Sequence, residues 1–492
     1  MYRLLLYFLI LLLIIAIIFS FFGLLPFSPL AIFFSSALLL LLCYITNTIF
    51  SKVLKIPTNG ESFYITAYIL ALIITPAISI QSITFLIEAS ILAMASKYIL
   101  VFQRKHFFNP AAIAVVITSF IFGQAASWWI GTAIMAPFVV LGGLLIVRKI
   151  QKEYMVVTFF AVALFISLFL SFFQGANLFL MLQRILLDSS LFFMGFIMLT
   201  EPHTTPPTRK LQMFYGGLVG LFFSPQIHFG VFYATPEIAL VIGNVFSYIV
   251  SPKQKLLLIL KEKIQTSKDT MDFLFARPRD FVYKSGQYME WTLSHKNSDT
   301  RGNRRYFTLS SSPTEETLRI GVKFYDKGSS FKKTLRQLTP KTPLLAGLLT
   351  GDFTLPKDTA RKLTFLAGGI GITPFRSMLQ YLLDRNEKRD IIILYANKIQ
   401  EDIVYKDVLD SVGKVLGIKV VYTLTDEKEN NHWKGLRGKV DEKMIQDTIP
   451  DYKERFFYLS GPKTMVDAYE NVLHALHIPS SHIKVDFFPG YA

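Results

Sequence analysis

The pattern of apolar positions divides the chain into two parts. Up to about residue 250 the apolar residues form long runs, and beyond it they form short runs between Gly, Pro, Asn and Asp turns. A membrane-spanning helix needs roughly 20 apolar residues. Ten runs approach this length: 4–23, 29–50, 62–80, 82–102, 108–123, 128–147, 154–173, 177–199, 211–224 and 228–250. Residues 1–252 are therefore predicted to form a ten-helix α membrane domain.

Basic residues fall on alternate loops of this predicted domain. They are Arg3, Lys52 and Lys55, Arg104 and Lys105, Arg148, Lys149 and Lys152, Arg209 and Lys210, and Lys253. The intervening loops contain no Lys or Arg. By the positive-inside rule we expect a multi-pass protein of a bacterial cytoplasmic membrane with both termini cytoplasmic. The first apolar run has no small-residue cleavage site after it, so it is interpreted as a retained helix.

The two halves of the membrane part contain related proline motifs. Thr75-Pro76 and Glu201-Pro202 are 126 positions apart, as are Asn109-Pro110 and Thr235-Pro236. Five helices per repeat would invert the second copy across the membrane, and proline-interrupted segments in inverted repeats often mark a buried site. We therefore expect inverted five-helix repeats, with kinked packing helices as the simpler explanation.

Four ionisable residues lie within the predicted spans. Arg184 and Asp188 are four positions apart on one helical face, so they are expected to pair with each other, and both are also candidate cofactor or ion residues. Glu88 and Lys97 lie on the fourth run. Glu88 has no local partner in the sequence and is therefore a candidate for ion or proton handling.

Two motifs resemble a known membrane family. His-Phe-Phe-Asn-Pro-Ala-Ala at 106–112 and Phe-Met-Gly-Phe-Ile-Met-Leu-Thr-Glu-Pro-His-Thr-Thr-Pro-Pro at 193–207 are similar to the flavin-carrying membrane subunits of the Rnf complex and of the sodium-translocating NADH:quinone oxidoreductase. The resemblance implies a domain that binds flavin and relays electrons, with candidate cofactor or ion residues Asn109, Pro110, Glu201, His203, Thr204 and Thr205. That family attaches FMN to the threonine of a Ser-Gly-Ala-Thr motif, but residues 123–129 here read Gly-Gln-Ala-Ala-Ser-Trp-Trp. Non-covalent FMN or riboflavin, or no flavin, remains open.

The second part predicts two further domains. Residues 253–357 alternate apolar and polar positions between turn residues, which predicts a small antiparallel β-barrel. From 358 to 492 apolar strands alternate with helical stretches, as in βαβ units with a parallel sheet. A glycine-rich turn, Gly368-Gly369-Ile370-Gly371-Ile372-Thr373-Pro374, follows the first of these strands. Glycines allow a pyrophosphate to approach the backbone, and the following helix offers free N–H groups.

Three other motifs share this half with the glycine turn. They are Arg305-Tyr306-Phe307-Thr308-Leu309-Ser310, then Gly328-Ser329-Ser330, then Ser460-Gly461-Pro462 with Met465. In this order the motifs resemble the ferredoxin–NADP reductase family. The resemblance implies that the first two motifs bind FAD and that the third, with residues 368–374, binds NAD(P)H. It also suggests that Tyr491 or Phe488 covers the flavin ring.

Composition excludes several other chemistries. The single cysteine, Cys43, cannot hold an iron–sulfur cluster, and no metal site is predicted. The formal net charge of +16 comes from dispersed basic residues, so nucleic-acid binding is not expected. A bis-haem arrangement is not expected either, because the membrane part contains only His106, His203 and His228.

The sequence predicts an NAD(P)H-dependent FAD oxidoreductase without a catalytic acid–base pair, because the flavin carries the chemistry. Electrons would pass to a membrane flavin, a quinone or an external acceptor, with ion coupling and partner subunits left open. The alternatives are a ferric-reductase-like protein, a transporter with a regulatory reductase, or a membrane anchor for a soluble-acceptor reductase. The choice between NADH and NADPH is open, since Lys398 could meet a 2′-phosphate or only solvent.

Overall fold

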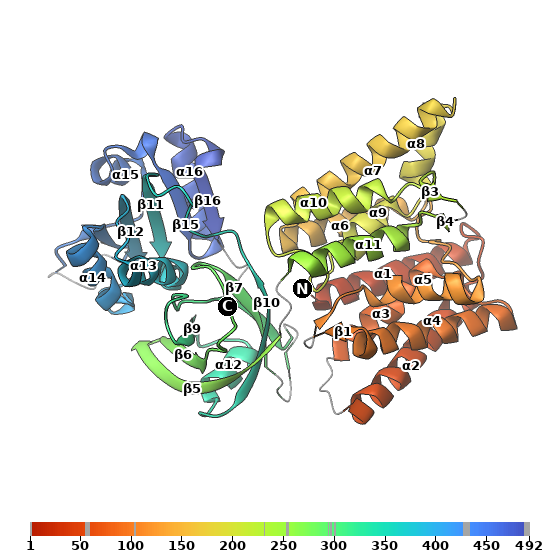
Figure 1. The fold of residues 1–492 in the computed structure, drawn as a ribbon, viewed down its shortest axis with the longest axis horizontal. Helices are drawn as coiled ribbons and strands as arrows, with labels where there is room; N and C mark the ends of the chain where they lie inside the picture. Colours follow the sequence, from red (N-terminus) through yellow and green to blue (C-terminus); the bar gives the residue numbers. More distant parts are fainter. Residues whose placement is uncertain are drawn as a thin grey trace. The chain divides into compact units, whose positions relative to one another are not determined.

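The structure is a computed structural model with two compact units, Met1–Gln254 and Lys255–Ala492 (Figure 1). It describes residues 2–54, 60–102, 105–230, 232–251, 255–293, 295, 298–299, 302–426 and 433–486. Each unit is considered separately below.

The described part of the first unit consists of helices and two short hairpins. The helices are α1 (Tyr2–Phe21), α2 (Pro29–Leu54), α3 (Gly60–Ile73), α4 (Ile80–Ile99), α5 (Pro110–Phe122), α6 (Ala136–Ile150), α7 (Glu153–Phe173), α8 (Leu178–Leu187), α9 (Leu191–Phe193) with the π-helical turn Met194–Met198, α10 (Arg209–Leu221) and α11 (Pro236–Val250). The hairpins pair β1 (Val101–Phe102) with β2 (Lys105–His106), and β3 (His228–Phe229) with β4 (Phe232–Tyr233).

Four of the described helices, α1, α2, α4 and α7, are long and apolar enough to cross a membrane. A fifth span results if α8 and α9 with its π-helical turn, which meet at a bend of 54°, are taken as one. The other predicted spans are shorter helices. The run at 128–147 begins with an irregular segment before α6, and the run at 228–250 begins with the β3–β4 hairpin.

The irregular segment before α6 caps the end of α3. Helix α3 ends at Ile73, shortly before Pro76, where the missing proline N–H prevents continuation. Its last carbonyl groups need other donors. The N–H groups of Ser127 and Trp128 donate to the Ile73 carbonyl at 3.0 and 2.8 Å, and the Trp129 indole donates to Ala71 at 2.9 Å. Groups of the protein itself therefore satisfy the carbonyl oxygens at the end of α3.

Helix packing follows a similar scheme in the two halves of this unit. Helix α2 packs on α4 and α7 packs on α10, while α4 contacts α5 and α10 contacts α11. Each half also has a hairpin followed by a helix that begins with proline, namely α5 after Asn109 and α11 after Thr235. Gly216 and Gly220 let α10 approach the backbone of α7, because a Cβ at Gly216 would lie 2.3 Å from the Met155 carbonyl oxygen.

The second unit begins with a six-stranded antiparallel sheet. Its elements are β5 (Leu256–Ser267), β6 (Thr270–Ala276), β7 (Tyr288–Thr292), β8 (Arg304–Thr308), β9 (Thr317–Lys323), α12 (Ser330–Gln337) and β10 (Pro343–Thr350). The strand order is β8-β7-β10-β5-β6-β9. Buried aromatic side chains such as Phe273, Phe275 and Trp291 fill its core. The order leaves β8 and β9 at the two ends, so the ladder pairing of the strands does not by itself close the sheet into the predicted barrel.

A six-stranded parallel sheet completes the second unit. Its elements are β11 (Leu363–Gly368), α13 (Thr373–Arg385), β12 (Ile391–Asn397), α14 (Lys406–Leu416), β13 (Lys419–Leu424), β14 (Leu436–Arg437), α15 (Glu442–Thr448), β15 (Phe456–Ser460), α16 (Lys463–Ala475) and β16 (Ile483–Asp486). The order is β14-β13-β12-β11-β15-β16. Helices α13 and α14 cover one face, and α15 and α16 cover the other (Figure 1). Because both faces are covered, every residue of β11 and β12 is buried.

Candidate functional site

Two glycine turns meet at the carboxyl edge of the parallel sheet. Strands β11 and β15 are neighbours, with Ala367 opposite Ser460, so the turns that follow them lie side by side. A Cβ added at Gly371 would lie 2.4 Å from the Ser460 carbonyl oxygen and 2.6 Å from the Cα of Gly461. The structure therefore brings together the two motifs assigned to NAD(P)H, and their contact requires glycine at position 371.

Met465 closes the other side of these turns. It lies in the first turn of α16, which begins after Pro462. A Cβ at Gly368 would lie 1.9 Å from the Met465 Cε, and one at Gly461 would lie 2.3 Å from the same atom. Met465 is therefore a half-buried packing residue beneath both glycines.

The glycine turn leads directly into α13. Gly369 has a positive φ of 51°, a conformation that favours glycine. Its carbonyl oxygen accepts a hydrogen bond from the Tyr395 hydroxyl at 3.0 Å. The Thr373 hydroxyl donates to the Ile370 carbonyl at 3.1 Å, and Pro374 lies in the first turn, where no N–H is needed. Ile372 is a core residue and presents no side chain to a ligand.

The residues of the first FAD motif lie on and directly after β8. The Arg305 guanidinium carbon lies 5.2 Å from the ring centroid of Phe331, and the Phe307 ring lies 6.0 Å from the same ring. Tyr306 projects to the opposite side, where its hydroxyl donates to the Glu290 carboxylate at 2.9 Å. Phe331 belongs to the first turn of α12. The strand and the helix N-terminus named by the two FAD motifs are thus adjacent.

The remaining residues of the first FAD motif are buried. Thr308 is 5% exposed, and Leu309 and Ser310 are fully buried. Leu309 belongs to the core of the antiparallel sheet. The Ser310 N–H donates to the Arg319 carbonyl at 2.8 Å, which links the ends of β8 and β9. Because Ser310 is buried, a ligand at this place would contact the atoms around Ser310 rather than its side chain.

The second FAD motif forms the N-terminus of α12. Ser329 caps the helix by accepting a hydrogen bond from the Lys332 N–H at 3.3 Å. The Ser330 N–H donates to the Asp299 carboxylate at 2.9 Å, and the His295 Nε2 lies 2.9 Å from the Ser330 hydroxyl. A helix N-terminus beside an arginine favours an anion. These residues fit an FAD pyrophosphate, provided that the phosphate replaces Asp299 as the acceptor at Ser330.

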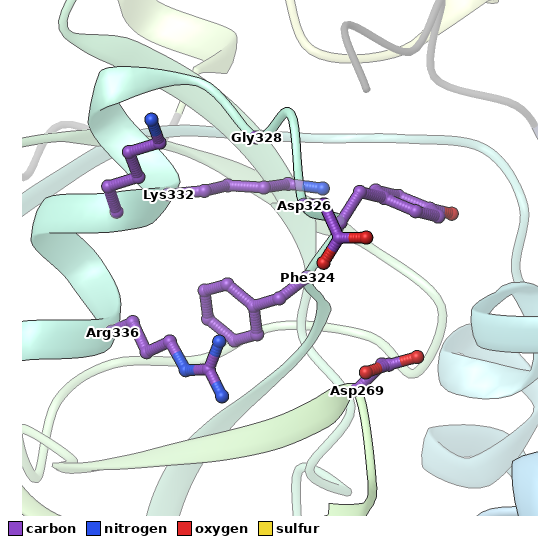
Figure 2. Close-up of a pocket in the computed structure, with 8 residues that line it drawn as sticks. Asp269, Phe324, Asp326, Gly328, Lys332 and Arg336 are labelled. Carbon is purple, nitrogen blue, oxygen red and sulfur yellow. The ribbon is translucent and has the colours of Figure 1, made fainter.

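A cavity of about 250 Å³ adjoins this turn. Figure 2 shows Lys332 and Arg336 of α12 extending toward Asp326 and Phe324. The Arg336 guanidinium carbon lies 5.5 Å from the Phe324 ring centroid, and the Lys332 ammonium donates to the Lys323 carbonyl at 2.8 Å. Gly328 lines the same cavity, so a flat, partly polar group could enter beside the predicted pyrophosphate site.

Buried polar contacts hold the parallel sheet against the antiparallel sheet. Arg376 of α13 donates to the Ser310 carbonyl at 3.0 Å and forms a two-point ion pair with Glu315. The Tyr405 hydroxyl donates to the Asp272 carboxylate at 2.6 Å, and Arg319 pairs with the same carboxylate at 3.2 Å. Burial raises the pKa of Asp272, although Tyr405 and Arg319 oppose this shift. These contacts fix the nucleotide turn relative to β8.

Asp486 lies beside the second glycine turn, although sequence analysis did not assign it a role. It ends β16, opposite Ser460, and is 8% exposed. Burial raises its pKa from 3.8 to about 7. It lies close enough to Tyr288 to interact electrostatically, and Tyr288 is paired with Thr308 across β7 and β8. The signal that could have identified Asp486 in the sequence is its position at the end of a strand that neighbours the glycine turns. The Tyr491 and Phe488 expectations lie outside the described residues.

The membrane unit contains a buried polar network around Asn109. The Asn109 side chain caps α5, and the Asn109 backbone N–H donates to the Asn244 side-chain oxygen at 2.7 Å. Asn244 donates to the Tyr215 hydroxyl at 3.0 Å. The Lys97 ammonium donates to the Ser62 carbonyl at 2.9 Å. The Lys97 bond joins α4 to α3. The bonds of Asn244 join α11 to the N-terminus of α5 and to α10.

The other membrane candidates have separate surroundings. His203, Thr204 and Thr205 are buried in the turn after Glu201-Pro202, whereas Pro110 begins α5. Glu88 is half-buried, and its Oε2 has no hydrogen-bond partner among the described residues. The expected pairing of Arg184 and Asp188 is wrong. Both side chains are exposed and form no ion pair with each other. Asp188 is the C-cap of α8, and its backbone N–H donates to the Arg184 carbonyl at 2.8 Å.

Comparison with known proteins identifies part of the second unit. The family model "Oxidoreductase NAD-binding domain" matches residues 365–471. The glycine betaine monooxygenase reductase subunit of Chromohalobacter salexigens is 28% identical over 231 residues, covering 46% of this chain and 62% of the relative. A flavohemoprotein of Oceanobacillus iheyensis is 25% identical over 237 residues, covering 46% and 57%. The chain thus spans about three fifths of the length of these relatives.

Two solved structures also resemble the second unit. The cytochrome b5 reductase domain of Ulva prolifera nitrate reductase is 22% identical and covers 48% of this chain and 98% of its own, with a TM-score of 0.43. A ferredoxin–NADP⁺ reductase from Neisseria gonorrhoeae with bound FAD and NADP is 17% identical and covers 48% and 98%, with a TM-score of 0.41.

The family match includes both glycine turns and the strands that carry them. Residues 365–471 of the second unit are therefore similar to an oxidoreductase NAD-binding domain.

Proposed function

We propose that the chain is a membrane-bound flavin oxidoreductase that passes electrons from NAD(P)H through FAD to an acceptor in its membrane unit. The observation that carries the proposal is the contact between the two glycine turns, Gly371 against Ser460-Gly461. In the same unit, Arg376 of α13 binds the loop after β8 through a hydrogen bond to the Ser310 carbonyl and an ion pair with Glu315. This unit is continuous with a unit of long apolar helices.

In this proposal the carboxyl edge of the parallel sheet binds the nicotinamide nucleotide. The N-terminus of α13 and the glycines at 368, 369 and 371 would receive its pyrophosphate, since no side chain keeps the backbone away. Ser460, Gly461 and Pro462 would form the opposite wall. Thr373 would orient the turn through its bond to Ile370.

FAD would bind along β8 and the N-terminus of α12. Arg305 would neutralise phosphate charge, the Phe307 ring would contact the isoalloxazine ring, and the Thr308 hydroxyl would bond to it. Bound FAD would accept a hydride from NAD(P)H and deliver electrons singly. The Arg376 and Tyr405 contacts would keep the two binding sites in register, which is a large part of catalysis by proximity.

The membrane half is proposed to hold the acceptor, either non-covalent FMN or riboflavin, or a quinone. Three features support this role. The two halves share a helix-packing scheme with proline-started helices, the Asn109–Asn244–Tyr215 network is buried among apolar helices, and two motifs resemble flavin-carrying membrane subunits. By the charge pattern of the loops, both termini would lie on the cytoplasmic side, where NAD(P)H is available. Relatives named as reductase subunits agree with electron delivery to a further acceptor.

Flavin analysis of the detergent-purified full-length protein tests the proposal. We expect FAD in the parent protein and its loss in Arg305→Ala. The matched control is Arg304→Ala, because Arg304 pairs with Glu290 at 3.4 Å instead of approaching Phe331. A second flavin that remains in Arg305→Ala would identify the membrane carrier, and acid precipitation would establish whether it is covalent.

Activity in proteoliposomes tests the electron acceptor. The parent protein should oxidise NADH or NADPH with a membrane quinone, and Arg305→Ala should not. If nucleotide oxidation occurs only with soluble acceptors, the membrane half serves as an anchor and not as an electron carrier. Substrate uptake without NAD(P)H would contradict the electron-transfer role and support a transporter.

A further inference from the structure

The antiparallel sheet carries apolar side chains on the face that points away from its core. In β5, Leu257 and Ile259 alternate with leucines that are buried in the core, so both side chains point outward. Strand β10 places Leu345 opposite Leu257 and Pro343 opposite Ile259. Residues directly opposite each other lie on the same face of a sheet. These four residues therefore form one patch, called the outer patch below.

The outer patch is open to its surroundings. Leu257 is 53% exposed and Ile259 is 49% exposed, whereas the outward face of an antiparallel sheet in water is usually polar. The other exposed large apolar residues of the described second unit lie singly on separate segments, and they are Val282, Tyr325, Val415 and Leu436. Single exposed apolar residues are ordinary, but a group of adjacent ones indicates a surface that binds a protein or a membrane.

Lysines surround the outer patch. Lys255 lies on the same face, because a Cβ added at Gly347 of β10 would lie 3.0 Å from the Lys255 Cγ. Lys261 is exposed and follows Ile259 by two positions on β5. Lys341 is also exposed, and its backbone N–H donates to the Leu260 carbonyl at 2.8 Å, next to the start of β10.

Two carboxylates in this region do not cancel the positive charge. Glu262 is exposed beside Lys261. Glu290 of β7 is 5% exposed and pairs with Arg304 of β8 at 3.4 Å. The three lysines and Arg304 thus outnumber the two carboxylates. An apolar patch with a basic rim is complementary to an anionic bilayer surface, where apolar side chains enter the interface and lysines contact lipid headgroups.

The connection to the first unit is short. Leu257 is seven residues after Val250, the last residue of α11. An extended chain advances about 3.3–3.6 Å per residue, so Leu257 lies within about 25 Å of the end of α11. In the proposed topology α11 ends at the cytoplasmic membrane surface. A small patch binds weakly from solution, but a short connection makes the binding intramolecular and therefore more favourable.

We propose that the outer patch docks on the anionic surface of the cytoplasmic leaflet. The apolar side chains of β5 and β10 enter the headgroup region, and the lysines around them bind lipid phosphates. This inference rests on the membrane location in the proposed function, and it adds a lipid-binding surface to the reductase unit.

Fluorescence quenching of the full-length protein in nanodiscs of phosphatidylcholine and phosphatidylglycerol tests the docking. Leu257→Cys would carry an environment-sensitive fluorophore. Val415→Cys is the matched control, because Val415 is 56% exposed on α14 of the same unit. Cys43 is fully buried, so the parent protein treated with the same reagent gives the blank. One quencher is a lipid with a doxyl group near its headgroup, and the other is iodide in water.

We expect the doxyl lipid to quench the label at position 257 and iodide to quench the label at position 415. Adding Lys261→Gln should lower the ratio of docked to undocked protein about 5-fold, the effect of one lysine near an anionic surface. Lys414→Gln, an exposed lysine of α14, should leave this ratio unchanged. Should Leu257→Cys not fold, Ile259→Cys would carry the label.

Strong iodide quenching at position 257 without quenching by the doxyl lipid would overturn the proposal, because the patch then faces water. Protection of this label from both quenchers would also overturn it, because protein and not lipid then covers the patch. Neither result depends on nucleotide or flavin, so both leave the proposed oxidoreductase activity intact. Failure of the parent protein to enter nanodiscs would contradict the proposed membrane location, and the docking with it.

Discussion

Replacing Gly371 with alanine tests whether the two glycine turns act as one binding surface. The added Cβ would lie 2.4 Å from the Ser460 carbonyl oxygen and 2.6 Å from the Cα of Gly461. An ordinary contact between such atoms is about 3.5 Å. The turns must therefore separate by about 1 Å, and both opposing groups are backbone, so no side-chain rotation can relieve the overlap.

Two effects follow from this separation. Overpacking of a tight contact lowers the free energy of unfolding by about 1–3 kcal/mol. A displacement of about 1 Å between a bound reactant and its partner lowers a reaction rate by up to about 100-fold. We expect Gly371→Ala to fold with reduced stability and to show a larger loss in flavin reduction by NAD(P)H than its stability alone explains.

The matched control is Gly413→Ala in α14, a helix that packs on the same parallel sheet. There the nearest heavy atom to an added Cβ is the Ile418 carbonyl oxygen at 3.6 Å, an ordinary contact. Alanine inside a helix is favoured over glycine by about 0.5–1 kcal/mol, so this variant should be slightly more stable and fully active.

Stopped-flow bleaching of flavin absorbance and urea unfolding of the full-length protein in detergent provide the two measurements. The reasoning is refuted if Gly371→Ala binds nucleotide and reduces its flavin like Gly413→Ala. Equal loss in both variants would indicate that the domain tolerates no added methyl group, rather than a specific contact between the turns.

Two further predictions concern buried groups of the same unit. Burial raises the pKa of Asp486 from 3.8 to about 7, so between these values the folded protein holds a proton that the unfolded chain has released. The free energy of unfolding should therefore fall as pH rises from about 4 to 7, by at most about 4 kcal/mol, and Asp486→Asn should remove this dependence in urea titrations. Tyr405→Phe removes the hydroxyl that donates to buried Asp272 and should cost about 1–3 kcal/mol by the same method. Tyr422→Phe, whose hydroxyl has no partner among the described residues, should be nearly neutral; a similar loss there would contradict the Tyr405 argument.

Local patterns in the sequence were sufficient to predict the division of the chain and the type of each part. Long apolar runs indicate helices that suit a lipid environment, and β11 and β12 are apolar because both faces of a parallel sheet are buried. The glycine turn after β11 was also predictable, since strand, glycines and helix are consecutive in the sequence. These features were predictable because each depends on residues that are close together in the sequence.

The irregular parts of the membrane unit were not predictable from apolarity. The run at 128–147 is apolar throughout most of its length, yet Ser127 and Trp128 leave the helical conformation to cap α3 at Ile73. The hydrogen bonds that stabilise this segment come from residues more than 50 positions away. Hydropathy describes the transfer of side chains from water to an apolar medium. It does not show which groups form hydrogen bonds with the backbone.

The sequence alone determined the candidate nucleotide and flavin residues, through the glycine turn after a predicted strand and through motifs whose order resembles the ferredoxin–NADP reductase family. Only the tertiary structure decided how they meet. The Gly371–Ser460 contact, the Tyr405–Asp272 bond and the buried position of Asp486 each depend on segments that are distant in sequence but adjacent in the fold. Burial, and with it the raised pKa of the Asp486 carboxyl, exists only once those segments are packed together.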